Sequence, residues 1–238
     1  MLFLVGTIST AAGADCRSIA YRGDQYAVCE VDPALQEIRL FLNRQGGRRF
    51  GQFNEIGRAL AVAGERLELA MNGGMYHRDR TPVGLYIEDG VQLTSLNTRP
   101  GPGNFHLLPN GVFFVLEDGV AGVLDAKAYR DAAQYPLYAT QSGPMLVIDG
   151  EVHPRFIPES DSLKRRNGVG VRTDGRVVFA ISDGAVNFHD FATFFRDEMK
   201  TPNALYLDGV ISRLYAPALG RDDPGPAMGP VIGVVVED

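Results

Sequence analysis

Five short polar segments of the sequence combine residue types that can bind or act on a ligand. Each places an amide, hydroxyl, carboxylate or guanidinium beside a glycine, which lets the backbone approach a ligand closely. The segments are Asn72-Gly73-Gly74, Gln141-Ser142-Gly143-Pro144, Arg166-Asn167-Gly168, Ser182-Asp183-Gly184 and Asp208-Gly209-Val210-Ile211-Ser212-Arg213. Any one of them alone is typical of a turn, and Asn-Gly is a common hairpin signal. Because all five adjoin apolar, strand-like sequence, we expect strand ends to bring them around one pocket.

The elements that must position these segments are mostly short strands. Asp-Gly and Asn-Gly pairs recur between β-branched or aromatic runs, which is the hairpin pattern. The expected strands are Tyr26–Val31, Ile38–Asn43, Leu67–Met71, Val83–Glu88, Val112–Leu116, Leu137–Thr140, Met145–Ile148, Gly168–Val171, Val177–Ser182, Ala204–Leu207, Ile211–Tyr215 and Val231–Val236.

Three helices complete the expected fold. Phe53–Ala63 carries an apolar stripe, Asp125 can cap Ala126–Ala133, and Asn187 or His189 can open a helix that runs to Lys200. The stripe of Phe188, Phe191, Phe194 and Phe195 along the last helix is expected to be core. The sequence therefore predicts a single α+β domain with a mixed or antiparallel sheet and a few packed helices.

Composition narrows the classes of partner and cofactor. The formal net charge of −6 argues against nucleic acid, because phosphate backbones need a basic surface. No stretch approaches the length of a membrane span. The sequence contains no dinucleotide or P-loop fingerprint, no calcium-hand loop and no zinc spacing, so we expect no cofactor and no metal. Nothing in the sequence indicates an oligomeric state.

The N-terminus predicts export. Residues 1–14 are apolar and end in Ala12-Gly13-Ala14, which resembles a signal peptide cleaved before Asp15, although no Lys or Arg precedes the run. The mature domain would then span residues 15–238, in the periplasm or secreted. Cys16 and Cys29 are the only cysteines, and in an oxidising compartment they would form a disulfide. The alternative is two free thiols in a cytosolic protein.

The order of the motifs resembles a known family. Asn72-Gly73-Gly74-Met75-Tyr76, Ser142-Gly143-Pro144, Arg166-Asn167-Gly168-Val169-Gly170 and Leu207-Asp208-Gly209 followed by Ser212 resemble the phosphodiester glycosidase domain, from about Ala27 to Val236. Animal members remove N-acetylglucosamine from a phosphodiester. The stretches 187–192 and 203–209 resemble a small exported bacterial branch. Val210 and Ile211 stand where animal members carry glycines, so this side of the pocket is reshaped and the animal substrate is not implied.

The resemblance implies roles for the polar segments. Cleavage of a sugar-1-phosphodiester needs a phosphate clamp and stabilisation of an oxocarbenium-like sugar. Arg166 suits the clamp because a guanidinium binds two oxygens, and its alternative is a salt bridge. Asp208 is the expected essential carboxylate, as nucleophile or as base for water; its alternative is a turn-forming residue. Asn72 completes the expected catalytic set.

The remaining candidates are expected to contact substrate. They are Gly73, Gly74, Ser142, Gly143, Asn167, Asp183, Ser212 and Arg213. Asp183 is a second carboxylate, although Ser-Asp-Gly before a helix is also an ordinary turn. His77, His106 and His189 are acid/base candidates, and an isolated histidine is more often structural.

The sequence thus predicts an exported hydrolase that cleaves a sugar-1-phosphodiester or a related envelope glycan. The main alternative is a module that binds a glycan or phosphosugar on the same fold without turnover, because both activities use the same residue types. A structural envelope protein without a small ligand is the third interpretation, and it requires the motifs to be accidental.

Overall fold

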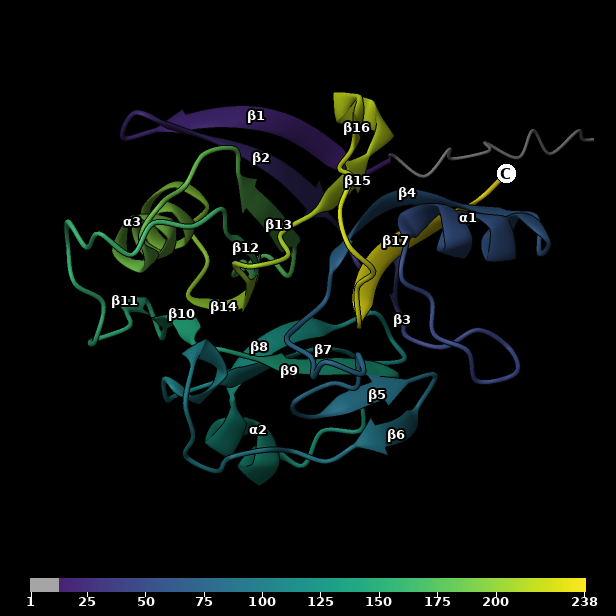
Figure 1. The fold of residues 1–238 in the computed structure, drawn as a ribbon, viewed down its shortest axis with the longest axis horizontal. Helices are drawn as coiled ribbons and strands as arrows, with labels where there is room; N and C mark the ends of the chain where they lie inside the picture. The colour runs from purple at the N-terminus through teal and green to yellow at the C-terminus, as the bar shows by residue number, and fades with distance from the viewer. Residues whose placement is uncertain (1–12) are drawn as a thin grey trace, which may run out of the picture.

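The computed structural model describes residues 13–238, so the expected signal peptide lies outside the described residues except for its last two. The chain forms three antiparallel sheets in one domain (Figure 1). The first sheet has the order β1 (Asp15–Tyr21), β2 (Asp24–Val31), β13 (Val177–Ser182), β12 (Asn167–Val171), β14 (Asn203–Asp208), β10 (Met145–Ile148), β11 (Glu151–Val152). The second has the order β16 (Arg221–Asp222), β15 (Leu214–Ala216), β4 (Glu65–Asn72), β17 (Val231–Glu237), β3 (Glu37–Phe41). The third has the order β6 (Val91–Thr94), β5 (Tyr86–Glu88), β9 (Tyr138–Ser142), β7 (Gly111–Val115), β8 (Ala121–Asp125).

The three sheets share one apolar core. Leu69, Phe113 and Phe179, one from each sheet, belong to the same buried cluster. The rings of Phe113 and Phe179 meet edge to face with centroids 6.1 Å apart, which fixes the third sheet against the first. Strand ends from all three sheets are thereby brought to one region of the molecule.

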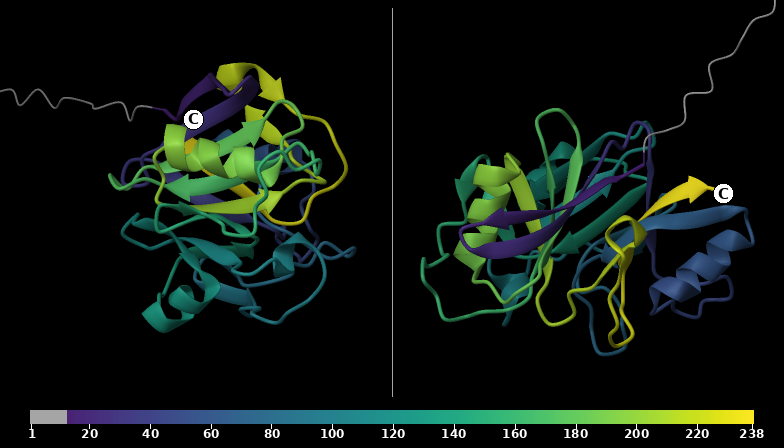
Figure 2. Two further views of the ribbon diagram at one scale, coloured as in Figure 1. Left: turned by 90° about the vertical axis from the view of Figure 1, so that its left-hand side faces the viewer. Right: turned by 90° about the horizontal axis from the view of Figure 1, so that it is seen from above.

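Each sheet is covered on its other face by one helix. α1 (Phe53–Ala61) packs on β4, α2 (Ala126–Ala132) packs on β7 and β8, and α3 (Phe188–Thr193) packs on β10. α3 continues as a π-helical turn, Phe194–Glu198. Figure 2 shows the helices at the outside and the strands meeting in the middle. Among residues 13–238, no helix is both long and apolar enough to cross a membrane.

The helix starts follow the expected capping. The Asp125 side chain accepts hydrogen bonds from the amides of Lys127 and Ala128, and Asn187 accepts one from the amide of Asp190. An oxygen at the N-cap satisfies amides that lack an intrahelical partner. The α+β class, the three helices and the antiparallel pairing are therefore confirmed. Phe191, Phe194 and Phe195 are fully buried, as expected of core residues, whereas Phe188 is partly buried and packs against them.

Cys16 and Cys29 are bonded in the structure. They face each other directly across the β1–β2 hairpin, and with them joined no free cysteine is present among residues 13–238. The bond closes the first hairpin at the edge of the first sheet. This confirms the pairing that the sequence favoured over free thiols.

Candidate active site

Two asparagines join the end of β4 to the start of β12. Asn72 Nδ2 donates to Asn167 Oδ1 over 3.1 Å, and Asn167 Nδ2 donates to the Asn72 carbonyl over 3.1 Å. The amide of Arg213 donates to Asn72 Oδ1 over 3.0 Å. Both side chains are fully buried. The structure therefore brings Asn72, Asn167 and Arg213 together, and the two asparagine side chains serve as internal links.

Two serines continue this network toward Asp208. Ser212 Oγ lies 2.9 Å from the Asp208 carbonyl and 3.0 Å from the Arg165 carbonyl. Ser142 Oγ donates to the Leu207 carbonyl over 3.0 Å. Both hydroxyls therefore hold the backbone around the end of β14.

At positions 73 and 74, after Asn72, the structure leaves little room for a side chain. A Cβ atom at Gly73 would lie 3.0 Å from the Ile232 nitrogen, and Gly74 has φ of +136°, where side chains are rarely accommodated. The Gly73 amide donates to the Pro230 carbonyl over 2.7 Å, so this donor is already used within the protein. At Gly143 a Cβ atom would lie 2.9 Å from the Phe105 carbonyl oxygen. These glycines permit close packing of the strand ends.

Asp208 is a buried carboxylate at the end of β14. Its Oδ1 accepts from the amide of Gly209 over 2.6 Å and from that of Val210 over 2.9 Å. It forms no salt bridge with any residue between 13 and 238. Burial raises the pKa of the Asp208 carboxyl, and the amide hydrogen bonds oppose that rise. A buried, unpaired carboxylate is costly to fold, and such groups are frequent at functional sites.

Arg166 does not lie as the phosphate clamp expected from the sequence. Its side chain is 1% exposed, and its guanidinium donates to Val186 O (2.8 Å), Tyr206 Oη (3.1 Å) and Ser162 O (2.7 Å). Its Cζ lies 3.7 Å from the centre of the Phe188 ring. Since the guanidinium is enclosed by protein acceptors and an aromatic face, a bidentate phosphate contact requires these to separate. The geometry therefore corrects the expected direct role.

The guanidinium of Arg213 lies against the segment 223–226, with its Cζ 5.0 Å from the centre of the Phe53 ring. Nε donates to the Asp223 carbonyl over 2.8 Å, and Nη1 donates to Gln52 Oε1 over 2.9 Å and to the Pro226 carbonyl over 3.0 Å. Within residues 13–238, these two nitrogens and a longer contact of Nη1 with Gly225 account for its hydrogen bonds. Nη2 has no hydrogen-bond partner among residues 13–238, and Arg213 is 5% exposed.

Tyr76 lies close to these residues and was not among the site residues expected from the sequence. Its hydroxyl lies 3.5 Å from the Ala227 carbonyl, next to the carbonyls that Arg213 contacts. Burial and the Asp208 carboxylate raise the pKa of Tyr76, whereas Arg80 and Arg213 lower it. The phenol is therefore near one carboxylate and two guanidinium groups. The signal was present in the Asn-Gly-Gly-Met-Tyr motif, in which the tyrosine closes the turn.

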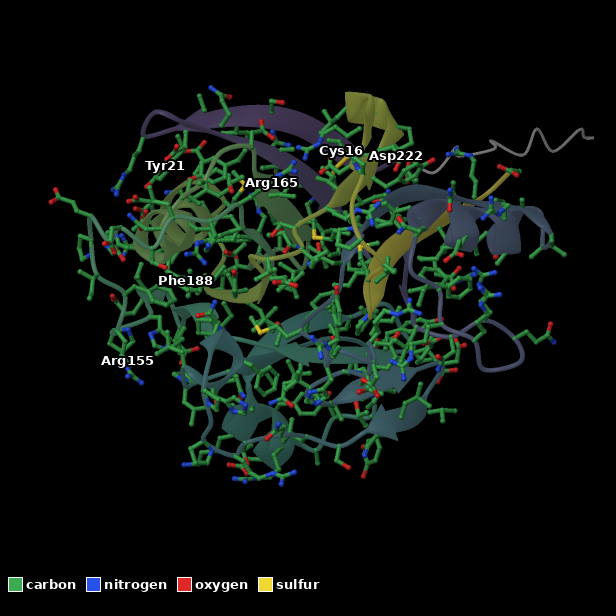
Figure 3. All side chains as sticks on the ribbon, viewed as in Figure 1. Cys16, Tyr21, Arg155, Arg165, Phe188 and Asp222 are labelled. Carbon is green, nitrogen blue, oxygen red and sulfur yellow. A yellow bond between two sulfur atoms is a disulfide. The ribbon has the colours of Figure 1, made fainter. Side chains whose placement is uncertain are left out.

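Asp183 lies at the protein surface, in a network of ion pairs. It is 2.9 Å from Arg221 Nη1, and Arg221 Nη2 is 2.7 Å from Asp223 Oδ2. Arg165 also contacts Asp223, over 3.0 Å. Figure 3 shows Arg165 on the side of the molecule toward β15 and β16, with Phe188 farther away near α3. Asp183 is thus engaged with arginine at the surface, while Asp208 is buried.

The histidine candidates lie in other surroundings. His106 Nδ1 contacts the Arg99 carbonyl over 2.8 Å, and His189 Nδ1 lies 3.6 Å from Asp190 Oδ1 at the start of α3. His77 is exposed on the turn after Tyr76. In the described part of the chain, no group of three or more His, Cys, Asp or Glu side chains is arranged to hold a metal ion.

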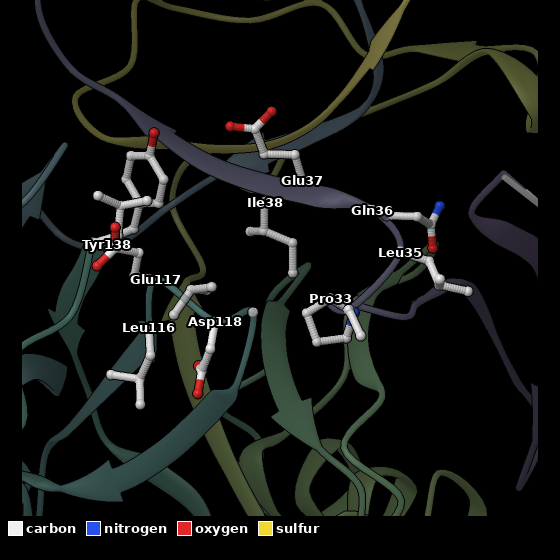
Figure 4. A pocket seen from close by; sticks show the side chains of 13 residues that line it. Pro33, Leu35, Gln36, Glu37, Ile38, Leu116, Glu117, Asp118 and Tyr138 are labelled. Atoms are coloured by element: carbon white, nitrogen blue, oxygen red, sulfur yellow. The ribbon is translucent and has the colours of Figure 1, made fainter.

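A surface hollow of about 390 Å³ lies elsewhere. It is lined by residues 33–38 and by the β7–β8 turn, with Glu37, Glu117 and Asp118 at its walls (Figure 4). None of the residues assigned to the site from the sequence lines it. Hydrogen bonds join the polar segments to one another, but this hollow is not the pocket that the sequence analysis placed among them.

Comparison with known proteins identifies the class. The family model described as phosphodiester glycosidase matches residues 65–228, and the chain belongs to that family. The Escherichia coli K12 protein YigE, described as uncharacterized, is 38% identical over 185 residues, which are 78% of this chain and 72% of YigE.

Two solved structures share the fold. The catalytic domain of zebrafish N-acetylglucosamine-1-phosphodiester alpha-N-acetylglucosaminidase, auto-inhibited by its pro-peptide, gives a TM-score of 0.64 at 17% identity, over 96% of this chain and 85% of that one. A hypothetical protein from Synechocystis gives 0.55 at 14% identity, over 94% and 62%. At these identities the likeness concerns the fold.

Proposed function

We propose that this protein hydrolyses the glycosidic bond of a sugar-1-phosphodiester or a related envelope glycan. The observation that carries the proposal is the buried Asp208 carboxylate, which has no counter-ion among residues 13–238 and lies at the meeting point of the family motifs. A carboxylate of raised pKa is a stronger base than an exposed one. The family's glycosidase description supplies the reaction class.

In the proposed reaction the bond between the anomeric carbon and the phosphate oxygen breaks. The phosphate monoester leaves with the electron pair, and water supplies the new hydroxyl on the sugar. Asp208 acts either as the nucleophile that first bonds the anomeric carbon or as the base that accepts the proton of water. Little acid assistance is needed because a phosphate monoester is a good leaving group.

Arg213 takes the phosphate contact in place of Arg166. Its Nη2 is free of hydrogen bonds to residues 13–238, while Nε and Nη1 hold its plane against the segment 223–226. A fixed guanidinium binds phosphate oxygen with little loss of side-chain freedom. Tyr76 lies beside it and offers a hydroxyl to the same ligand. Asn72, Asn167, Ser142 and Ser212 serve by holding the strand ends in place.

Export to the periplasm or the medium is part of the proposal. The bonded cysteines support it because disulfides persist in oxidising compartments. β1 begins at Asp15, so cleavage before that residue would leave the first strand whole. Mass spectrometry of the mature protein should give an N-terminus at Asp15, and an intact Met1 on exported protein would contradict the cleavage site.

The test is hydrolysis of a panel of sugar-1-phosphodiesters, among them N-acetylglucosamine-1-phosphate methyl ester. The full chain should release reducing sugar, and Asp208→Asn should lower kcat by about 10³-fold while remaining folded. Asp118→Asn is the matched control, since Asp118 forms the same kind of turn, with Oδ1 accepting from Val120 over 3.1 Å at the surface. It should keep full activity.

Calorimetric titration with the same compounds distinguishes a hydrolase from a module that only binds its ligand. A wild-type protein that binds a phosphosugar, releases no sugar and binds equally well as Asp208→Asn is a binding module. An Asp208→Asn enzyme with wild-type kcat would refute the role of this carboxylate.

A further inference from the structure

Arg166 is a buried cation for which the proposed reaction has no direct use. Among residues 13–238 it forms no salt bridge, and two of its three hydrogen-bond acceptors are neutral backbone carbonyls. Enclosing a charge without a counter-ion is costly. The Phe188 face, 3.7 Å from Cζ, offsets part of that cost through a cation–π contact. Only one of the three acceptors of Arg166 is a side-chain group.

That third acceptor is the hydroxyl of Tyr206. Arg166 Nη1 donates to it over 3.1 Å, and Tyr206 is fully buried. Tyr206 stands two positions before Asp208 in β14, and the pairing of β14 with β12 shifts register between these two residues.

The hydroxyl also presses against the residue after Asp208. A Cβ atom placed on Gly209 would lie 1.9 Å from Tyr206 Oη, so the hydroxyl occupies the space of a side chain at 209. Gly209 lacks a positive φ in the structure, and the close contact alone accounts for the absence of a side chain. The amide of this same glycine donates to Asp208 Oδ1 over 2.6 Å.

We propose that Tyr206, held by Arg166, is a positioning residue that fixes the Gly209 amide against the Asp208 carboxylate. The contacts form one chain from guanidinium to phenol, from phenol to glycine, and from glycine amide to carboxylate. Its catalytic consequence rests on the function proposed for Asp208. Its structural content does not, because the state of the Gly209 amide can be measured without turnover.

Removing the hydroxyl should loosen this chain. In Tyr206→Phe the Gly209 amide should exchange its hydrogen about 10-fold faster or more by NMR, since the turn can then open locally. Tyr138→Phe is the matched control: it removes another buried phenolic hydroxyl, which donates to Asp89 over 2.6 Å in the third sheet. Exchange at Gly209 should be unchanged in the control.

The pH profile is a second readout that general destabilisation does not move. The amide hydrogen bonds of Gly209 and Val210 lower the Asp208 pKa against the effect of burial. Weakening one of them should move the acid limb of kcat to higher pH in Tyr206→Phe, with KM little changed. The other ionisable groups near this turn include Tyr76, Tyr206 itself, Arg166 and Lys164, whose Cβ is 3.5 Å from the Cβ position of Gly209.

A double variant tests the contact itself. Gly209→Ala places a methyl group onto the hydroxyl and should lower both stability and kcat. In the Tyr206→Phe background the nearest atom becomes Cζ, at 3.1 Å, so the same alanine should cost much less. Equal losses in both backgrounds would show that the hydroxyl does not confine Gly209.

The outcomes separate this inference from the proposed function. Unchanged Gly209 exchange in Tyr206→Phe overturns the positioning role whatever the protein catalyses. Faster exchange in a protein that hydrolyses none of the test compounds supports the positioning role and removes only its catalytic consequence. Faster exchange with wild-type kcat and an unmoved acid limb shows that the Gly209 amide is dispensable for the reaction, and this overturns the catalytic part.

Discussion

Asn72 and Asn167, 95 residues apart in sequence, exchange two hydrogen bonds in the fully buried centre of the molecule. This pair connects the second sheet to the first at the point where β4 and β14 end and β12 begins. The Asn72 side chain also accepts a hydrogen bond from the amide of Arg213, the residue just before β15. Asn72, which the sequence suggested as a ligand-binding residue, therefore has a structural role in linking the two sheets.

Breaking the Asn72–Asn167 pair should destabilise the protein. Asn167→Ala removes both exchanged hydrogen bonds and leaves the Asn72 amide without its acceptor in a buried setting. We expect a loss of about 2–4 kcal/mol in the free energy of unfolding, measured by urea denaturation. Asn203→Ala is the control, because that half-buried asparagine on β14 contacts the surface turn at Asp149. It should lose about 1 kcal/mol or less. Equal losses in the two variants would contradict the structural role of the Asn72–Asn167 pair.

Much of the fold could be predicted because its signals are local. Alternating or apolar runs between glycine-containing turns placed most strands, and Asp125 and Asn187 marked helix starts through their own side chains. β1 and β8 were not expected, nor were the shorter edge strands β6, β11 and β16. β1 and β8 pair only with the strand beside them in the chain, at a sheet edge, and their residues are mostly half-buried or exposed. Such strands lack the strong apolar signal.

The site could be predicted only as a set of positions. Polar groups beside glycines at strand ends indicated that Asn72, Asn167 and Asp208 would meet. What each side chain does depends on partners supplied by distant segments. Arg166 is enclosed because Ser162, Val186 and Tyr206 place acceptors around it, and no local pattern shows that. An arginine in a loop looks the same in sequence whether it faces solvent or protein.

Substitution of Arg213 should affect substrate binding more than turnover. Arg213→Lys keeps the charge but loses the fork whose Nε and Nη1 hold the segment 223–226. If Nη2 binds the phosphate, KM should rise about 10-fold or more while kcat changes little. Steady-state kinetics on the compound cleaved best by wild type provides the measurement.

Gln52→Ala controls for disturbance of the segment 223–226. It removes one acceptor of Nη1, at 2.9 Å, without altering Nη2. A rise in KM as large as that of Arg213→Lys would mean that the loss of anchoring, and not the loss of a phosphate donor, explains the arginine effect.

Reduction of the disulfide should lower stability without changing the site. The bond joins residues 13 apart, and loop-closure entropy predicts a contribution of about 3 kcal/mol. The Cys16→Ser/Cys29→Ser variant should unfold at lower urea concentration and keep its kcat, because the hairpin lies at the sheet edge. A variant as stable as wild type would show that β1 is held by its strand pairing alone.

Glu88 should make stability fall as pH rises toward neutrality. Burial raises the pKa of the Glu88 carboxyl from 4.5 to about 7, while hydrogen bonds from the Tyr86 hydroxyl and the Leu42 amide oppose the rise. A group with a raised folded-state pKa binds its proton more tightly when folded. Its contribution is therefore complete below pH 4.5 and is lost as pH increases through about 7.

Glu88→Gln tests this directly because glutamine is neutral and keeps an oxygen for the Leu42 amide at 3.1 Å and the Tyr86 hydroxyl at 2.8 Å. The variant should match wild type near pH 4 and exceed it by about 1–3 kcal/mol near pH 8 in urea unfolding. Glu117→Gln, at an exposed turn, should follow wild type throughout. If Glu88→Gln is less stable than wild type at pH 8, the carboxylate is ionised and favourably held in the folded protein, and the sign of the pKa shift is wrong.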